Sequence, residues 1–222
     1  MLTEDYFMRM INQLLAVMTQ ILYHREAGRY QEAQVLIDQS LEQLLGVPPD
    51  LLRQMDDKSL LRLLTTQGEL DPDRLALVAD LYKLEGDLLS DQGKEREAEL
   101  DYQRSMTFFL EIRLSGQDEG LYDIDQKIDN LHEKLSGRDL PIEVVFLLFD
   151  YFEMTNKYAR VEEQISRLLE KDEQRPEILA EVISYYESRL EQGDEELLAG
   201  GVARAEIEKR LQMVNNQFRE NG

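Results

Sequence analysis

The sequence predicts an all-α protein, and three observations lead to this prediction. The 222 residues include only 12 Gly and 5 Pro, fewer than the combined share of about 12% that is usual for soluble proteins. Leu, Glu, Gln, Arg, Asp and Ala dominate the sequence, and most of these residues favour helices. Alternating runs of β-branched residues, which would indicate strands, are nearly absent. We therefore expect about ten helices.

The first expected helix covers residues 4–27, with Thr3 as its N-cap and Gly28 at its end. Glycine suits the left-handed conformation that often closes a helix. A second helix is expected over residues 30–45. Two short helices, 49–55 and 59–65, are expected in an insertion at residues 48–67.

A second hairpin is expected to begin at Asp71 and Pro72, because Asp caps a helix and Pro fits its first turn. Its first helix ends at Gly93, and the partner helix over residues 95–114 completes an N-terminal module, residues 1–115. Residues 116–138 are expected to form a connecting segment, with a helix over about 121–135.

A C-terminal module, residues 139–222, is expected to contain two more hairpins and a capping helix. Pro141 opens the hairpin that turns at Asn156, and Pro176 opens the one that turns at Gly193. The pair Gly200-Gly201 is expected to break the chain before the last helix. An apolar stripe at helical spacing identifies that helix: Ile207, Leu211, Val214 and Phe218.

The four turns share a pattern of compact and apolar residues. Five residues after each turn stand Ala33, Ala98, Val161 and Leu198. Nine residues after each turn stand Ile37, Tyr102, Ile165 and Val202. Two antiparallel helices need a compact residue where they approach most closely and larger apolar residues one turn further on. The pattern therefore predicts repeated helical hairpins.

The segment from Gly28 to Ala33, which reads Gly-Arg-Tyr-Gln-Glu-Ala, resembles the hairpin turn of tetratricopeptide repeats. Gly86 adds the small residue that this family often has seven residues before its turn. The first two gaps between turns are nearly twice the family's period of about 34 residues. The resemblance thus implies a right-handed array of hairpins that inserted helices interrupt twice.

A second resemblance begins in the opening stretch Asp5-Tyr6-Phe7-Met8-Arg9-Met10-Ile11. This stretch, together with the chain up to about residue 115, resembles an uncharacterised bacterial family of unknown function. That resemblance implies no activity.

Tetratricopeptide repeats typically bind peptides on the concave face that their first helices form. The family's groove positions, carried over onto this sequence, give twenty residues, of which nine are acidic and two are basic. The expected binding residues among them are Asp80, Lys83, Asp87, Asp91, Glu143, Phe146, Asp150, Glu153, Glu187 and Glu191. The resemblance implies a scaffold or adaptor that binds a protein or peptide, and a basic partner would suit these acids. The alternative is that the acids only face water, as exposed residues of any acidic protein do.

The first helix carries few polar residues, and they fall on one stripe. A terminal helix normally exposes one face, so we expect this helix to be covered on both sides. Three covers stay open at this point. They are the inserted helices or the tail, a small apolar ligand, and a second copy of the chain that contacts Tyr6, Phe7, Met10 and Leu14.

The charge excludes some classes of partner. The chain has 46 acidic and 25 basic residues and a net charge of −21, whereas nucleic-acid binding needs a positive surface. The longest apolar run, residues 144–149, is too short to span a membrane, which takes about 20 residues. The N-terminus is acidic where a signal peptide is basic. We therefore expect a cytoplasmic protein with no nucleic-acid or membrane partner.

The sequence contains no candidate catalytic, metal or cofactor site. The chain has no Cys and two His, so zinc ribbons and thiolate nucleophiles are excluded. His24 and His132 lack the spacing of a metal pair, and no Gly-rich phosphate loop is present. We expect a non-catalytic interaction module. Two alternatives stay open: a small-molecule-binding regulator or enzyme with a site between helices near the first helix, and a homodimeric structural protein.

Overall fold

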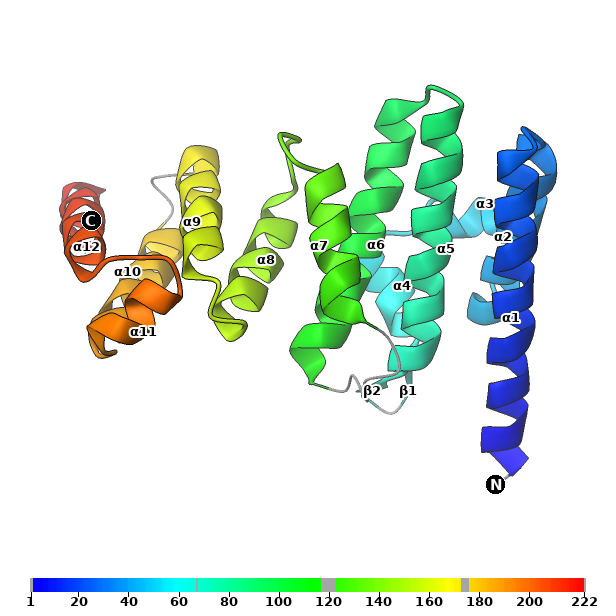
Figure 1. Cartoon of the computed structure of the whole chain (residues 1–222), viewed down its shortest axis with the longest axis horizontal. Helices are drawn as coiled ribbons and strands as arrows, with labels where there is room; N and C mark the ends of the chain where they lie inside the picture. Colours follow the sequence, from blue (N-terminus) through cyan, green and yellow to red (C-terminus); the bar gives the residue numbers. More distant parts are fainter. Residues whose placement is uncertain (1, 67, 117–122, 173–175, 222) are drawn as a thin grey trace. The chain divides into compact units, whose positions relative to one another are not determined.

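The computed structural model describes residues 2–66, 68–116, 123–172 and 176–221, and these residues form twelve helices and one pair of two-residue strands (Figure 1). The all-α fold class predicted from composition is confirmed. The chain divides into two compact units, Met1–Arg138 and Asp139–Gly222. Each unit is described by itself below.

Unit 1 is built on two helical hairpins with a short insertion between them and one further helix. The first hairpin consists of α1 (Leu2–Glu26) and α2 (Tyr30–Leu45), and the second of α5 (Pro72–Asp91) and α6 (Glu95–Ser115). The insertion and the last helix comprise α3 (Pro49–Leu52), α4 (Asp57–Leu63), β1 (Thr65–Thr66), β2 (Glu69–Leu70) and α7 (Ile124–Lys134). The strand pair was not predicted from the sequence.

Local signals set the helix boundaries in unit 1. Gly28 and Gly93, at the two hairpin turns, adopt φ of 70° and 75°, a conformation that costs a glycine no steric strain. The side chains of Asp56 and Asp71 accept hydrogen bonds from the backbone N–H of Ser59 and Arg74, three residues further on. These side chains satisfy N–H groups that a helix start otherwise leaves unpaired.

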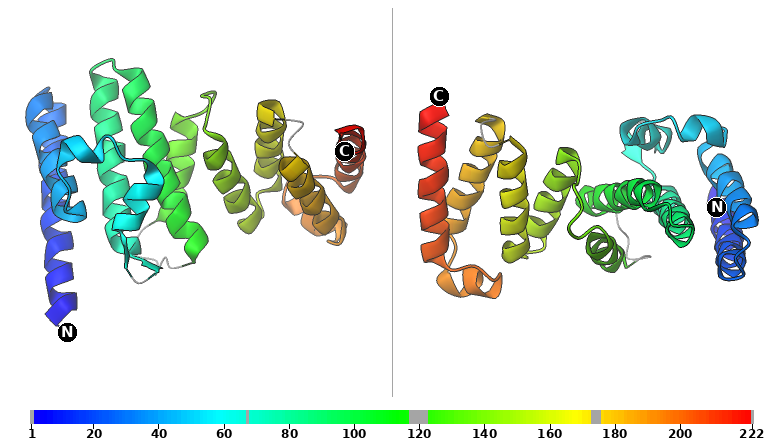
Figure 2. Two further views of the ribbon diagram at one scale, coloured as in Figure 1. Left: turned by 180° about the vertical axis from the view of Figure 1, so that it is seen from behind. Right: turned by 90° about the horizontal axis from the view of Figure 1, so that it is seen from above.

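Helix α5 lies at the centre of unit 1 and contacts α1, α2 and α6. Its five consecutive residues 75–79 are all buried, as expected for a helix covered on every side. Figure 2 (right) shows α7 on one side of the α5–α6 pair, and α3 and α4 on the opposite side. The inserted helices α3 and α4 therefore do not occupy the side of the pair on which α7 lies.

Two arginines attach the insertion to the rest of unit 1. Arg53, next to α3, forms ion pairs with Asp38 of α2 and with Glu85 of α5, at 3.5 Å in the second case. Arg104 of α6 donates to the Asp57 carboxylate of α4 at 2.7 Å. Burial raises the pKa of Glu85, so this carboxyl depends on its partners to remain ionised.

The two helices of the central hairpin approach most closely at Gly86. A Cβ atom added there would lie 2.7 Å from the ring of Tyr102 and 3.1 Å from the carbonyl oxygen of Ala98. The compact residues predicted five positions after the turns, Ala33, Ala98 and Val161, are all buried. The close approach inferred from sequence is thus seen in the α5–α6 hairpin, and the expected compact residues are buried in the first three hairpins.

Unit 2 contains five helices around an aromatic core. They are α8 (Ile142–Met154), α9 (Tyr158–Asp172), α10 (Pro176–Leu190), α11 (Asp194–Ala199) and α12 (Arg204–Asn221). Helix α8 packs on α9, and their turn holds Asn156 at a φ of 55°. The rings of Phe149 and Tyr185 join α8 to α10 at a centroid distance of 5.3 Å.

The fourth predicted hairpin is wrong in detail. Gly193 has a φ of −73° and is the N-cap of α11, which ends after only six residues. Leu198, expected at a close approach, is 64% exposed, and Leu197 is buried in its place. Helix α10 instead packs against α12. Gly200 is the C-cap of α11 and lies against the Tyr158 ring, and Gly201 has a φ of 89°, so the chain leaves the helix at the predicted glycine pair before a second long helix can form.

The expected double covering of the first helix is also wrong for the side chains described. Leu15 and Leu22 of α1 are 46% and 41% exposed, and Tyr23 is 63% exposed. The predicted capping helix, by contrast, is present as α12. Its stripe buries Ile207 and Val214, while Phe218 stays 40% exposed.

We predict that Gly86→Ala destabilises the fold by about 1–3 kcal/mol, because the added methyl group overlaps the Tyr102 ring and backbone of the facing helix. Urea unfolding followed by circular dichroism measures the loss. Gly193→Ala is the matched control, since a Cβ there meets nothing within 4 Å, and it should change stability by less than about 0.5 kcal/mol. Equal stability of the two variants would contradict the close packing at Gly86.

Candidate functional site

The carboxylate of Asp87 is a buried point of attachment in unit 1. Only 4% of the residue is exposed. Lys83 donates to it at 2.7 Å, the Tyr102 hydroxyl at 2.9 Å and Arg25 at 3.2 Å. Lys134 forms an ion pair with it at 3.2 Å. One carboxylate thus connects four helices: α1, α5, α6 and α7.

The electrostatics of Asp87 depend on these partners. Burial raises the pKa of Asp87, but the hydrogen bonds from Lys83 and Tyr102 and the charge of Lys134 more than offset that effect and lower it overall. Asp87 is therefore ionised at neutral pH and is balanced by three cations. Because Arg25 is also paired with Asp91, these three cations face two carboxylates, and the group keeps an excess of one positive charge.

Three acids that were predicted to face a partner are paired within unit 1. Asp80 accepts from Lys127, Asp87 has the partners above, and Asp91 forms a two-bond pair with Arg25 at 2.6 and 3.1 Å. The hydrogen bond from Arg25 lowers the pKa of Asp91. The acids at the groove positions of unit 1 therefore stabilise the unit and do not form an unpaired acidic surface.

A pocket of about 360 Å³ lies beside this cluster, on the α7 side of the α5–α6 pair. Its lining combines apolar residues from α1, α5, α6 and α7 with charged and amide residues from α5 and α7: Met18, Leu22, Leu84, Phe109, Leu131, Asp80, Lys83, Lys127, Asn130 and Lys134. Phe109, Leu84 and Leu131 are buried, so they form an apolar floor. Lys83 and Asp80 were predicted as site residues from the sequence, but the two α7 lysines were not, because α7 belongs to no predicted hairpin.

The first helices of the two hairpins predicted in unit 2 are strongly acidic. Helix α8 and helix α10 carry one basic residue, Arg189, and six acids: Glu143, Asp150, Glu153, Glu177, Glu181 and Glu187. Helix α9 has similar numbers of acids and bases. We refer to Asp150, Glu153, Glu181 and Glu187 as the acidic face of unit 2.

Asp150 shows the repulsion within the acidic face. The residue keeps an exposed surface, but partial burial, and then the charges of Glu181 and Glu153, raise its pKa to about 6. Glu153 is paired with Arg189 at 3.3 Å, which leaves Asp150 close to uncompensated negative charge. Burial is the larger cause of the raised pKa, and the nearby charges of Glu181 and Glu153 add to it.

The predicted residues of unit 2 differ in exposure. Glu143, Asp150, Glu187 and Glu191 are exposed, and Phe146 and Glu153 are half-buried. Glu181, which lies near Asp150, was not predicted. The positions for the last hairpin were counted back from Gly193, which is not a turn of the expected kind, so the register was unreliable there.

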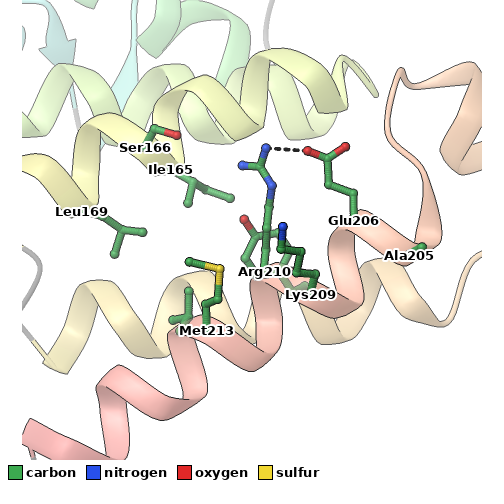
Figure 3. A pocket seen from close by; sticks show the side chains of 10 residues that line it. Ile165, Ser166, Leu169, Ala205, Glu206, Lys209, Arg210 and Met213 are labelled. Atoms are coloured by element: carbon green, nitrogen blue, oxygen red, sulfur yellow. Dashed lines mark hydrogen bonds and ion pairs between the residues drawn. The ribbon is translucent and has the colours of Figure 1, made fainter.

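A second pocket, of about 570 Å³, lies between α9, α10 and α12 (Figure 3). Arg210 of α12 extends into it and donates to Glu206 at 2.7 Å and to the buried Glu162 of α9 at 2.6 Å. Tyr186 of α10 also donates to Glu162, at 2.9 Å. These bonds attach the capping helix to α9 and α10, and the charges within the pocket balance.

The family model that matches the sequence covers residues 1–219 and describes a family of unknown function, DUF6483. The chain belongs to this family. The match extends well beyond residue 115, where the resemblance seen in the sequence was expected to end. The chain matches no curated protein and no solved structure, so the DUF6483 family adds no activity to the geometry.

The remaining sequence predictions fall partly outside the residues described. The side chains of Tyr6, Phe7 and Met10, three of the four proposed dimer contacts, lie outside the described set, and Leu14 is buried within unit 1. In the part of the chain that is described, no three His, Asp or Glu residues group as metal ligands. None of the described helices combines the length and apolar character needed to cross a bilayer.

We predict that Asp87→Ala destabilises unit 1 by about 3–5 kcal/mol, since it leaves several buried donors without their shared acceptor. Asp91→Ala is the matched control, because Asp91 pairs with Arg25 at the surface and should cost less than about 1 kcal/mol. Urea denaturation at pH 7 measures both. If Asp87→Ala costs no more than Asp91→Ala, the carboxylate does not hold the four helices together.

We predict that Asp150 titrates near pH 6 and opposes folding when it is ionised. Its folded pKa is raised to about 6 from an ordinary 3.8, so the folded state binds the extra proton between these values. The contribution of Asp150 to stability is therefore favourable at pH 4 and is lost as the pH rises through 6. Asp150→Asn should be more stable than the parent at pH 7.5 and equally stable at pH 4.

Urea midpoints at the two pH values and an NMR titration of the Asp150 carboxyl carbon check this prediction. Glu191→Gln, an exposed substitution outside the acidic face, supplies the control for a simple change in net charge. A carboxyl that titrates near pH 4 would show that neither burial nor the charges of Glu181 and Glu153 raise its pKa.

Proposed function

We propose that the protein is a non-catalytic interaction module whose acidic face in unit 2 binds a basic, amphipathic segment of a protein partner. The observation that carries this proposal is the concentration of unbalanced acids on α8 and α10. Six acids and one base occupy these two helices. A cationic segment would relieve their repulsion, whereas a neutral or anionic one would not.

Apolar side chains among the acids provide anchors for such a segment. Phe146 of α8 and Ile183 and Leu190 of α10 are half-buried, and Met154 is 43% exposed. Binding energy at interfaces comes mainly from a few apolar or aromatic anchors that lose their contact with water. The surrounding charges contribute more to the rate of encounter and to the choice of partner.

The raised pKa of Asp150 supports a cationic partner on energetic grounds. A lysine or arginine placed near Asp150 offsets the charges of Glu181 and Glu153 and favours ionised Asp150. Binding should therefore strengthen as the pH rises through 6. Added salt should weaken it, because the Debye length falls to about 3 Å at 1 M salt.

The resemblance to tetratricopeptide repeats agrees with this proposal. Three hairpins place glycine or asparagine at positive φ in the turn and a compact buried residue five positions later. In that family the first helices of the hairpins form the binding surface, and here α8 and α10 are the first helices of the two hairpins predicted in unit 2. We propose on the same basis that the protein acts in the cytoplasm as a scaffold or adaptor.

The experiment measures the binding of a defined probe, a fluorescent helical peptide with lysines on one side and leucines on the other. We expect saturable binding by fluorescence anisotropy that weakens with salt. The variant Asp150→Lys/Glu181→Lys/Glu187→Lys should weaken binding by at least about 100-fold, which corresponds to roughly 3 kcal/mol. Asp87 is excluded from this variant because its carboxylate stabilises unit 1.

The matched control is Glu195→Lys/Glu196→Lys/Glu208→Lys, which makes the same change in net charge at exposed positions of α11 and α12. Affinity purification from the native cell then compares three baits: the parent chain, the acidic-face variant and this control. A partner retained by the control and lost by the variant supports the proposal. If both variants lose the partner equally, binding depends on the overall charge of the protein and not on the acidic face.

A further inference from the structure

We propose that the lysine-lined pocket of unit 1 binds a small amphipathic monoanion, a carboxylate attached to an unbranched apolar body. This inference goes beyond the proposed function and does not rest on it, because it concerns a different unit and the opposite charge. Three features of the pocket carry it: an excess of positive charge, lysine donors that remain available, and an apolar floor.

The charges at the pocket do not cancel. The pocket residues Lys83 and Lys134 are joined through Asp87 to Arg25 and Asp91, and the pocket residues Lys127 and Asp80 form a separate ion pair. The group joined through Asp87 holds three cations and two carboxylates, which leaves one positive charge in a protein of net charge −21. A ligand with one negative charge would complete the balance.

The lysines can bind an anion without giving up their present partners. Lys83 and Lys134 share the Asp87 carboxylate, and each ammonium group has three N–H donors. The side chains of Lys83 and Lys134 are 37% and 41% exposed, so their remaining donors are accessible from the pocket. The oxygens of an incoming carboxylate would accept hydrogen bonds from these N–H groups in place of water.

The apolar part of the pocket favours a ligand whose carboxylate is attached to a hydrocarbon body. Phe109, Leu84 and Leu131 form a buried floor, and Leu22 of α1 stands at the wall with 41% of its surface exposed. A hydrocarbon body placed there would remove Leu22 from water, which is favourable by about 25 cal/mol for each Å² of apolar surface buried. The volume of about 360 Å³ is near the lower limit of ligand pockets, about 300 Å³, and fits a small molecule rather than a folded segment.

The test uses the full chain and two probes that share one tail, octanoate and 1-octanol. Isothermal titration calorimetry should give a dissociation constant for octanoate on the order of 0.1 mM. Octanol, which lacks the charge, should bind at least about tenfold more weakly. Lys134→Gln should weaken octanoate about tenfold while the octanol affinity is unchanged.

A filling variant tests the location of the site. Leu22→Trp places a larger side chain at the pocket wall and should abolish octanoate binding. Leu15→Trp is the matched control, because Leu15 lies two turns earlier on α1, is similarly exposed and does not line the pocket. Thermal unfolding confirms that both variants remain folded, since neither side chain belongs to the buried core.

Three results would overturn the inference: octanoate produces no binding at about 5 mM, octanol binds as tightly as octanoate, or Leu22→Trp binds octanoate like the parent chain. The acidic-face variant of unit 2 should bind octanoate normally. This variant separates the two proposals. If the peptide proposal fails, octanoate should still bind in unit 1, and if the octanoate proposal fails, the peptide should still bind to unit 2.

Discussion

The buried carboxylate of Asp87 is the constraint on which the arrangement of unit 1 depends. It is the acceptor shared by Arg25, Lys83 and Tyr102 and the ion-pair partner of Lys134. These side chains come from four helices, so their positions are fixed together. A buried charge without such partners would cost several kcal/mol. Because buried Asp87 needs cationic partners, Lys83 and Lys134 are held beside the neighbouring pocket. The positive charge of the pocket is therefore a consequence of how the helices are joined.

Asp150 occupies the equivalent place in the first hairpin of unit 2 and has the opposite environment. Both residues stand six positions before a hairpin turn. The pKa of Asp87 is lowered by its lysine and tyrosine partners, whereas burial, Glu181 and Glu153 raise that of Asp150. Position within a hairpin therefore does not determine what a carboxylate does. The deciding partners lie far away in sequence: Arg25 is 62 residues from Asp87, and no local pattern relates the two.

The same distinction explains how far the sequence could predict the fold. Signals that act within one or two turns of helix, such as Gly28, Gly93, Asn156, and Pro72 after Asp71, correctly predicted the first three hairpins. The prediction was wrong at Gly193, although the break at Gly200-Gly201 was expected. The sequence did not indicate that this break would end α11 after six residues or that α12 would pack beside α10 in its place, because both depend on tertiary packing. For the site, residue types at groove positions were identified, but the lysines of α7 and Glu181 were not, because tertiary packing brings them there.

Net charge is a poor guide to what either unit binds. The value of −21 averages over the whole chain, but a ligand at a surface responds to charges within about one Debye length, roughly 8 Å at physiological salt. The pocket of unit 1 is lined by three lysines and one acid, Asp80, whereas α8 and α10 of unit 2 carry six acids and one base. Charges beyond that distance are largely screened where they are exposed to solvent. One strongly acidic chain can therefore carry a site for an anion and a surface for a cation, and each must be judged from its own neighbours.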